Sequence, residues 1–333
     1  MIILEHNKLQ FSFPEVHVDA KCRIDFQRTL RIPDDNREYP LPPGFGSFPL
    51  HHVDDFKSNL PGRWIDHGGV FLPMYQAEAM WINFSSDYPC AVKIATGKID
   101  AISGEEWDGK INEESEEQDY VVIPEQPWLD GYCIGEGRIR QFVAMPLGEG
   151  FSAEEQLTGK AEHGGVQIMV FPMKHERYEE LQRQQESEPE MLYCCQSVSE
   201  YTTEPMEMGL APGGLMRQEV YDDPYGYDAW DLENTSRCFV HIVNTASYHK
   251  ITGYAPPSDP VTPGQYEKVG LPWFDYYAAD QKALKGAPKL AGMDSVAAKV
   301  IKQGNQALAD NDPVQPTKVV GLGGKHVVRE ENF

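Results

Sequence analysis

The sequence predicts a mainly β protein that forms a sandwich or a barrel-like structure. One form of this prediction has two related β units. A few peripheral helices and a helical C-terminal region are expected to complete the fold. Many short segments rich in β-branched and aromatic residues end at turn residues, and 29 glycines and 25 prolines separate them. Segments with helical periodicity are few, and they do not alternate regularly with strands as a doubly wound α/β fold requires.

The composition restricts the class of protein and its partners. The chain has 333 residues, of which 41% are hydrophobic and 11% aromatic, enough to build a sizeable core. Its formal net charge of −23 argues against binding to nucleic acid or to anionic membrane surfaces. The same charge favours a neutral or cationic small ligand. The sequence does not identify a cofactor.

The sequence also favours a cytoplasmic location. The apolar start at residues 1–4 is too short for the core of a signal peptide. The apolar run at Val166–Met173 is far shorter than a membrane span. The six cysteines contain no CxxC motif and are expected to be reduced and mostly buried.

Five regions are expected along the chain. Residues 1–50 contain an N-terminal strand and an extended Pro-rich segment, and residues 51–175 form a first β unit. Residues 176–204 form a helical connector, and residues 205–275 form a second β segment that completes the core. Residues 276–333 hold a helical region and a β-prone tail.

Local patterns predict the elements of the N-terminal half. Apolar residues alternate with polar ones from Val18 to Ile32, which predicts a strand with one buried face. Residues 33–50, rich in Pro and Gly, are expected to lie extended across the surface. Residues 91–102 read as a hairpin that turns at Thr96–Lys98. The acid-rich stretch 104–119 is expected to be a solvated loop.

Helices are predicted at four places. Ser152, with Glu155 three residues later and Gly159 at the end, predicts a capped helix. A polar helix is expected from Lys174 onward, and two C-terminal helices at residues 275–286 and 294–304. The tail at residues 318–328 is expected to form two short strands around a glycine turn.

Two segments share an acid-His-Gly-Gly-Val pattern followed by an apolar run. They begin at Asp66 and Glu162, and we call them the HGG segments. They indicate a duplicated unit, a chance match, or a shared active site in which His67 and His163 converge with Asp66 and Glu162 as catalytic carboxylates. Adjacent residues of an extended chain point to opposite faces, so an acid and its neighbouring histidine cannot easily bond side chain to side chain.

Acidic and aromatic residues alternate in Arg217–Asp231, which we call the acid–aromatic loop, and again near Trp128. Carboxylates beside aromatic faces suit a sugar, an amine or a calcium-bound sugar. Alternatively, the aromatic rings pack inward while the acids face water. The candidate ligand-binding residues are Glu219, Tyr221, Asp222, Asp223, Tyr225, Asp228 and Trp230, with Glu125, Trp128 and Asp130.

Six segments resemble those of an uncharacterised protein family of fungi and bacteria. They are Gln118–Gly131, Ile139–Gly150, Glu154–Gly159, Glu162–Gly165, Met216–Gly226 and Gly270–Tyr277. The resemblance covers most of residues 40–300. The family has no assigned activity, so the resemblance implies no catalytic residues.

These patterns favour a soluble intracellular protein that binds or self-assembles without catalytic turnover. The tail is expected to hold a homo-oligomer together, because its valines and Leu322 form a short β-prone stretch. The alternative is a hydrolase-type enzyme that uses His67 and His163 with nearby carboxylates, either with or without a bound divalent metal ion.

Overall fold

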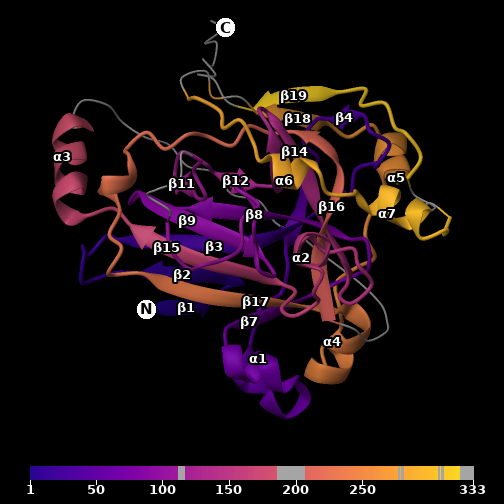
Figure 1. Cartoon of the computed structure of the whole chain (residues 1–333), viewed down its shortest axis with the longest axis horizontal. Helices are drawn as coiled ribbons and strands as arrows, with labels where there is room; N and C mark the ends of the chain where they lie inside the picture. Colours follow the sequence, from indigo (N-terminus) through magenta and orange to yellow (C-terminus); the bar gives the residue numbers. More distant parts are fainter. Residues whose placement is uncertain are drawn as a thin grey trace, which may run out of the picture.

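The structure is a computed structural model that describes residues 1–111, 117–185, 207–276, 278, 281–306, 308 and 311–322. Its described part is mainly β, as predicted: a 17-stranded sheet with helices at its periphery, and a separate two-stranded sheet (Figure 1). None of the helices in these ranges combines the length and apolar character that a membrane crossing needs.

The elements have the following bounds. The strands of the large sheet are β1 (Ile2–Glu5), β2 (Lys8–Ser12), β3 (Lys21–Thr29), β4 (Glu38–Tyr39), β5 (Gly44–Ser47), β6 (His51–His52), β7 (Val70–Met74), β8 (Ala79–Ser85), β9 (Cys90–Thr96), β10 (Ile99–Asp100), β11 (Val121–Ile123), β12 (Trp128–Leu129), β13 (Gly131–Gly135), β14 (Arg138–Pro146), β15 (Val166–Pro172), β16 (Glu207–Arg217) and β17 (Ser236–Asn244). Strands β18 (Trp273–Tyr276) and β19 (Val319–Leu322) form the small sheet. The helices are η1 (Val53–Asn59), α1 (Gly62–His67), α2 (Ala153–Thr158), α3 (His175–Gln185), η2 (Tyr227–Ala229), α4 (Thr245–Thr252), α5 (Pro263–Val269), α6 (Pro288–Ala291) and α7 (Val296–Lys302).

The large sheet is one continuous, branched ladder. Its main path runs β1-β2-β3-β8-β14-β16-β17-β15-β9, and every pairing along it is antiparallel. Strand β7 joins β17 as a parallel branch, and β10 and β11 join β9. The pairings of the described strands do not close into a ring. Strands from residues 1–50, 51–175 and 205–275 therefore share one sheet.

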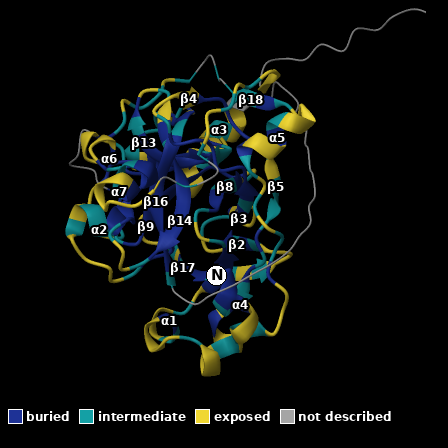
Figure 2. Cartoon of the chain, turned by 90° about the vertical axis from the view of Figure 1, so that its right-hand side faces the viewer, coloured by how far each residue is buried: buried dark blue, intermediate teal, exposed yellow. Residues whose placement is uncertain are grey.

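One extensive core cluster lies along this sheet, and smaller clusters lie under helices. The strands at the centre are almost wholly buried, whereas exposed residues lie mainly in the helices and loops around them (Figure 2). Val143 and Phe151 pack with Val296 and Val300 of α7. A third cluster, which contains Trp64, Phe71 and Val243, lies beneath η1, α1 and α4.

Several local predictions are confirmed. Ser152 and Glu155 form a capping box at the start of α2, and Gly159 ends the helix in the left-handed conformation. Strands β9 and β10 form the predicted hairpin across Gly97 and Lys98. The structure also contains α3, the start of the predicted connector, and α7. The rest of the connector, residues 186–204, lies outside the described residues.

The predicted surface position of the Pro-rich segment is wrong. Tyr39, Leu41, Phe48 and Leu50 are all buried. The backbone N–H of Phe48 donates to the Phe26 carbonyl, and Leu41 bridges to Phe274. The segment is extended as expected, but it packs into the core, because its apolar side chains find partners on distant strands.

The acid-rich stretch is not simply a solvated loop. Asp119 is buried, and its carboxylate lies 2.5 Å from the ammonium of the buried Lys93. Asp108 also contacts that ammonium, at 3.0 Å. Lys93 lies on β9, outside the acid-rich stretch, so the charge pattern of that stretch does not predict its pairing with Asp119. Residues 112–116 lie outside the described part.

The predicted helix at residues 275–286 is also wrong for the residues described there. Asp275 and Tyr276 belong to β18, and Ala283 forms an isolated bridge with Tyr221. Strand β18 pairs in parallel with β19, the first of the two strands predicted in the tail. Long-range pairing here overrides a helical periodicity. The second tail strand falls in residues 323–328, outside the described part.

Candidate functional site

The outer face of β17 carries a ladder of rings and one guanidinium. Arg237, Phe239 and His241 alternate with core-facing residues, so all three share this face. The Trp64 ring stacks on His241 with centroids 4.5 Å apart, and the His67 ring stacks on Phe239 at 4.6 Å. Residues three apart share one face of a helix, so α1 presents both rings to the strand. The Arg237 guanidinium lies 4.9 Å from the centroid of the Phe239 ring.

The glycines of the two HGG segments lie on either side of β17. Gly68, Gly69, Gly164 and Gly165 all have positive φ, and each pair leads into a strand that begins with valine. Both valines, Val70 and Val166, pair with Val240. A Cβ on Gly69 would lie 2.2 Å from the Phe239 carbonyl oxygen, and one on Gly165 would lie 2.5 Å from that of Val240. Close backbone approach therefore requires glycine at both positions.

The structure brings His67 and His163 together. Their ring centroids are 5.7 Å apart and the rings are nearly parallel. Strand β7 runs parallel to β17 and β15 runs antiparallel, so the two segments leave this point in opposite directions. Whether the segments arose by duplication stays a prediction.

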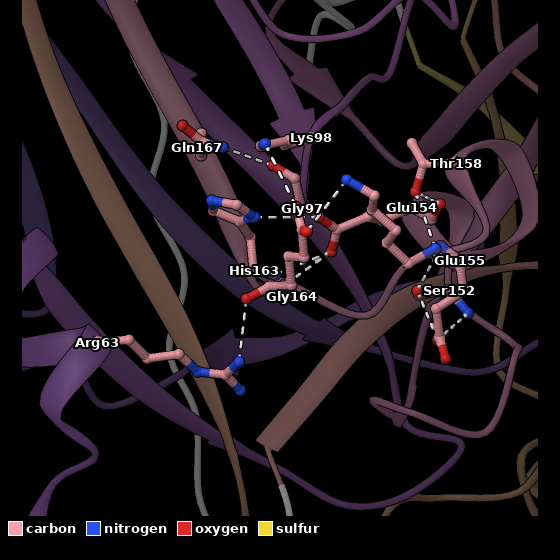
Figure 3. Close-up of polar contacts among 12 residues, drawn as sticks. Arg63, Gly97, Lys98, Ser152, Glu154, Glu155, Thr158, His163, Gly164 and Gln167 are labelled. Carbon is pink, nitrogen blue, oxygen red and sulfur yellow. Dashed lines mark hydrogen bonds and ion pairs between the residues drawn. The ribbon is translucent and has the colours of Figure 1, made fainter.

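The carboxylate partner of His163 is Glu154. This side chain is buried, and its Oε1 lies 3.2 Å from His163 Nδ1 (Figure 3). Its Oε2 accepts hydrogen bonds from the backbone N–H groups of His163 and Gly164, both at 3.1 Å. With Nδ1 donating to the carboxylate, the ring keeps Nε2 as its proton acceptor. In Figure 3 this second nitrogen faces away from Glu154.

Helix α2 holds Glu154 in place. Its first turn is secured by the Ser152 capping box, and the Gly97 turn packs closely against the carboxylate. A Cβ on Gly97 would lie 2.5 Å from Glu154 Oε2. Sequence reasoning missed this residue, because the local pattern identifies Glu154 only as an ordinary acid in the first turn of a helix.

The carboxylates predicted from the HGG segments lie elsewhere. Asp66 is exposed at the end of α1. The Glu162 carboxylate is exposed and pairs with Lys160 at 3.3 Å and Lys98 at 3.5 Å, which lowers its pKa. The Glu162 carbonyl accepts a hydrogen bond from Arg63 Nη1 at 3.0 Å. The structure thus unites His67 and His163 but places neither predicted acid in a hydrogen bond with its histidine.

The surroundings favour neutral imidazoles. Partial burial lowers the pKa of His67, and nearby His163 lowers it further, although Asp66 acts in the opposite direction. Burial lowers the pKa of His241 to about 4. At pH 7 the rings of His67 and His241 are therefore mostly uncharged.

Asp223 organises part of the acid–aromatic loop. Its Oδ2 accepts hydrogen bonds from the Tyr120 hydroxyl at 2.6 Å and Trp230 Nε1 at 2.8 Å. Its Oδ1 accepts from the Tyr225 backbone N–H at 2.8 Å. The Tyr225 hydroxyl in turn donates to Glu125. The structure therefore brings together four of the predicted ligand-binding residues: Glu125, Asp223, Tyr225 and Trp230.

The remaining acids of this loop have separate surroundings. Asp222 forms an ion pair with Lys282. Asp228 is exposed, and its backbone carbonyl accepts a hydrogen bond from Lys174. Glu219 is half-buried.

Tyr221, Trp128 and Asp130 lie within packed surroundings. The buried Tyr221 hydroxyl accepts a hydrogen bond from the Ala278 N–H at 3.1 Å. Trp128 packs edge-on against Tyr276, with centroids 4.8 Å apart. Asp130 accepts a hydrogen bond from Gln218, and burial raises its pKa to about 7.

The chain matches no family model, no curated protein and no solved structure. The function is therefore argued from the geometry of these sites.

Proposed function

We propose that the protein acts inside the cell by binding and self-association rather than by catalytic turnover. The observation that carries the proposal is the exposed strand β19. Val319, Val320 and Leu322 are 44%, 38% and 38% exposed, an apolar surface at the edge of a sheet. Exposed apolar edge strands readily pair with another chain. With a net charge of −23 on each copy, such pairing needs an apolar interface.

One edge of β19 is available for this pairing among the described residues. Strand β18 occupies the other edge, and Leu41 bridges to the far side of β18. A second copy could add its own β19 to the free edge, and a two-fold arrangement would make the contact symmetric. In the neighbouring segment, Leu271 is 44% exposed and provides further apolar surface for a homo-oligomer.

Light scattering tests the self-association. We expect an oligomer for the full-length chain and a smaller species for Val320→Lys, because an edge lysine opposes strand pairing. A chain ending at Asp312, which lacks β19, should behave like Val320→Lys. The control is Ile301→Lys on α7, where the native side chain is 64% exposed away from β19, and it should leave the mass unchanged. A monomer in every case would contradict the proposal.

We also propose a neutral or cationic small ligand at the acid–aromatic loop. Glu125 Oε2 is buried and has no hydrogen-bond partner among the described residues. Buried acceptors are normally satisfied, so a ligand N–H would complete the site. The nearby Asp223 carboxylate and the Tyr225 ring add attraction for a cation.

A titration with benzylamine, followed by NMR, tests this ligand site. Saturable binding to the native protein should weaken about tenfold or more in Glu125→Gln, which keeps the shape but removes the charge. Asp228→Asn removes an exposed carboxylate from the same loop and should leave the affinity unchanged. Equal affinities in all three proteins would place the ligand elsewhere.

The second candidate is an acid–base enzyme, favoured by the contact between Glu154 and His163. A carboxylate that orients Nδ1 leaves Nε2 positioned to take a proton from water or substrate. No group of three or more His, Cys, Asp or Glu side chains suited to a metal ion occurs in the described ranges.

Hydrolysis of a panel of esters and phosphoesters tests the enzyme. A true activity should fall about 100-fold or more in His163→Ala, and Glu154→Gln should also lower it. His175→Ala, a half-exposed histidine on α3, is the control. One equivalent of metal in the native protein that is lost in His163→Ala would also favour the enzyme. Activity that survives His163→Ala would reject this site.

A further inference from the structure

Three histidines lie where the helices η1, α1 and α4 meet the sheet. These helices cover the third hydrophobic cluster, and we call them the helical cap. Figure 1 shows α1 and α4 beneath β7 and β17. His51 lies on β6, His67 ends α1, and His241 lies on β17. The cap contains neither β19 nor the acid–aromatic loop, so it is separate from the two binding surfaces proposed above.

The His241 ring is covered by α1. It is 4% exposed, and the Trp64 ring stacks on it with centroids 4.5 Å apart. Its Nε2 lies 3.0 Å from the carbonyl oxygen of Gly68, in the turn that follows α1. Both contacts depend on the position of α1. Burial lowers the pKa of His241 from its ordinary value of 6.5 to about 4.

His51 makes the corresponding contacts with the other two cap helices. Its Nε2 lies 2.6 Å from the Tyr248 hydroxyl of α4. Its ring packs edge-on against Phe56 of η1, with centroids 5.6 Å apart. Burial lowers the pKa of His51, although Asp55 acts in the opposite direction. Together with His67, which stacks on Phe239, these rings connect every helix of the cap to the strands.

Nearby positive charge opposes protonation of two of these rings. Arg63 acts in this way on both His67 and His241, and Arg237 acts on His67. Asp66 favours a charge on His67, but its side chain is exposed, and water weakens the attraction.

The three histidines have no carboxylate in ion-pair contact. In the described part of the chain, the ion pairs of histidine lie elsewhere, at His6, His17, His163 and His175. The charged and titratable groups of the elements around the cap are Asp54, Asp55 and Lys57 on η1, Arg63 and Asp66 on α1, His249 and Lys250 on α4, His52 on β6, Glu207 on β16, Arg237 on β17, and His163 with Glu154 and Glu162 beside β15. Glu207 is paired with Arg63, and Glu154 with His163.

We propose that the helical cap is an acid-sensitive element, which detaches from β7 and β17 when these histidines take up protons. Detachment of α1 removes Trp64 and the Gly68 carbonyl from His241. Detachment of η1 and α4 removes Phe56 and Tyr248 from His51. The rings then meet water, which stabilises their charged form, so proton uptake and detachment are coupled.

The direction of this coupling follows from the lowered pKa values. Docking is fully favoured above pH 6.5, where the rings are neutral in both states, and it weakens as the pH falls toward 4. In this range the detached cap accepts protons that the docked cap excludes. Between pH 7 and pH 5, His241 alone should raise the ratio of detached to docked cap about 20-fold. His51 and His67 add to this change.

Hydrogen exchange of the backbone amides, measured by mass spectrometry at pH 7 and pH 5, tests the proposal. After correction for the intrinsic exchange rates, protection in α1 and α4 should fall about 20-fold or more at pH 5. Protection in β3 and β8 should change far less, because these strands do not contact the cap histidines. An equal fall in the strands and in the cap would indicate general acid unfolding and would overturn the proposal.

Variants assign the protons to particular rings. His241→Gln cannot be protonated and should remove most of the pH dependence in α1. His51→Gln and His67→Gln replace less buried rings and should each reduce the pH dependence of the cap. His249→Gln is the control on α4, because His249 is exposed and accepts protons whether or not the cap is docked. If His241→Gln does not fold, the other two variants decide. An unchanged pH dependence in the variants that fold, or an equal effect of His249→Gln, would overturn the proposal.

Discussion

Replacing Gly69 by alanine is expected to lower the free energy of unfolding by about 3 kcal/mol or more. Gly69 has φ +83°, a conformation that costs L-residues energy, and its missing Cβ faces the Phe239 carbonyl oxygen at 2.2 Å. A methyl group cannot fit there unless β7 moves away from β17. Urea denaturation of the native protein and of Gly69→Ala measures the loss.

The adjacent glycine provides a matched control. Gly68 has φ +65°, but a Cβ there would meet nothing within 4 Å. Gly68 has ψ −148°, outside the left-handed helical region, so Gly68→Ala should cost only the conformational energy, about 2 kcal/mol. Equal losses of stability in Gly69→Ala and Gly68→Ala would show that glycine is not required at position 69 by the close approach to β17. The larger loss in Gly69→Ala should come with separation of the His67 and His163 rings, since His67 lies directly before this turn.

Replacing Lys93 by methionine is expected to destabilise the protein by about 3–5 kcal/mol. The lysine is only 3% exposed, and its ammonium contacts Asp119 at 2.5 Å and Asp108 at 3.0 Å. Removing it leaves the buried Asp119 carboxylate without this counter-charge. Lys98→Met, which removes a lysine 40% exposed and 3.5 Å from Glu162, should change stability by less than about 0.5 kcal/mol.

The loss of stability caused by Lys93→Met should be larger at pH 8 than at pH 5. Burial raises the pKa of the nearby Asp100 to about 7 from 3.8, while Lys93 acts to lower it. Between pH 3.8 and about 7 the folded protein retains a proton that the unfolded chain has released, so stability falls as pH rises through this range. Without Lys93 the pKa of Asp100 should rise further, so this fall should continue to higher pH. Denaturation at both pH values measures the effect, and a loss independent of pH would contradict it.

A double variant separates the ion pair from packing. Adding Asp119→Leu to Lys93→Met removes both buried charges, so part of the lost stability should return. If the double variant is less stable than Lys93→Met alone, the methionine has disrupted packing rather than left a charge unpaired.

The sequence alone was enough for features that depend on neighbouring residues. The capping box of α2 needs only Ser152, Glu155 and Gly159, and all three act within one helix. The β9–β10 hairpin depends on a two-residue turn. Strand β3 follows from alternation along a single strand, but its polar face is not wholly solvent-exposed as predicted, because Asp25 and Thr29 are buried too. The mainly β character is the sum of many such local signals. The sequence also selected His67 and His163, because their pattern repeats.

Only the tertiary structure decided which of these residues meet. Strand β17 lies between β7 and β15, and this arrangement places His67 beside His163. The same packing selects Glu154 as the carboxylate at His163 and buries Lys93 with Asp119. Residues 275–276 form a strand against β19, although their local pattern favours a helix. In each case the deciding contact joins residues on different segments of the folded chain. These contacts are stabilised by burial and backbone pairing that exist only in the folded chain, so local sequence patterns do not predict them.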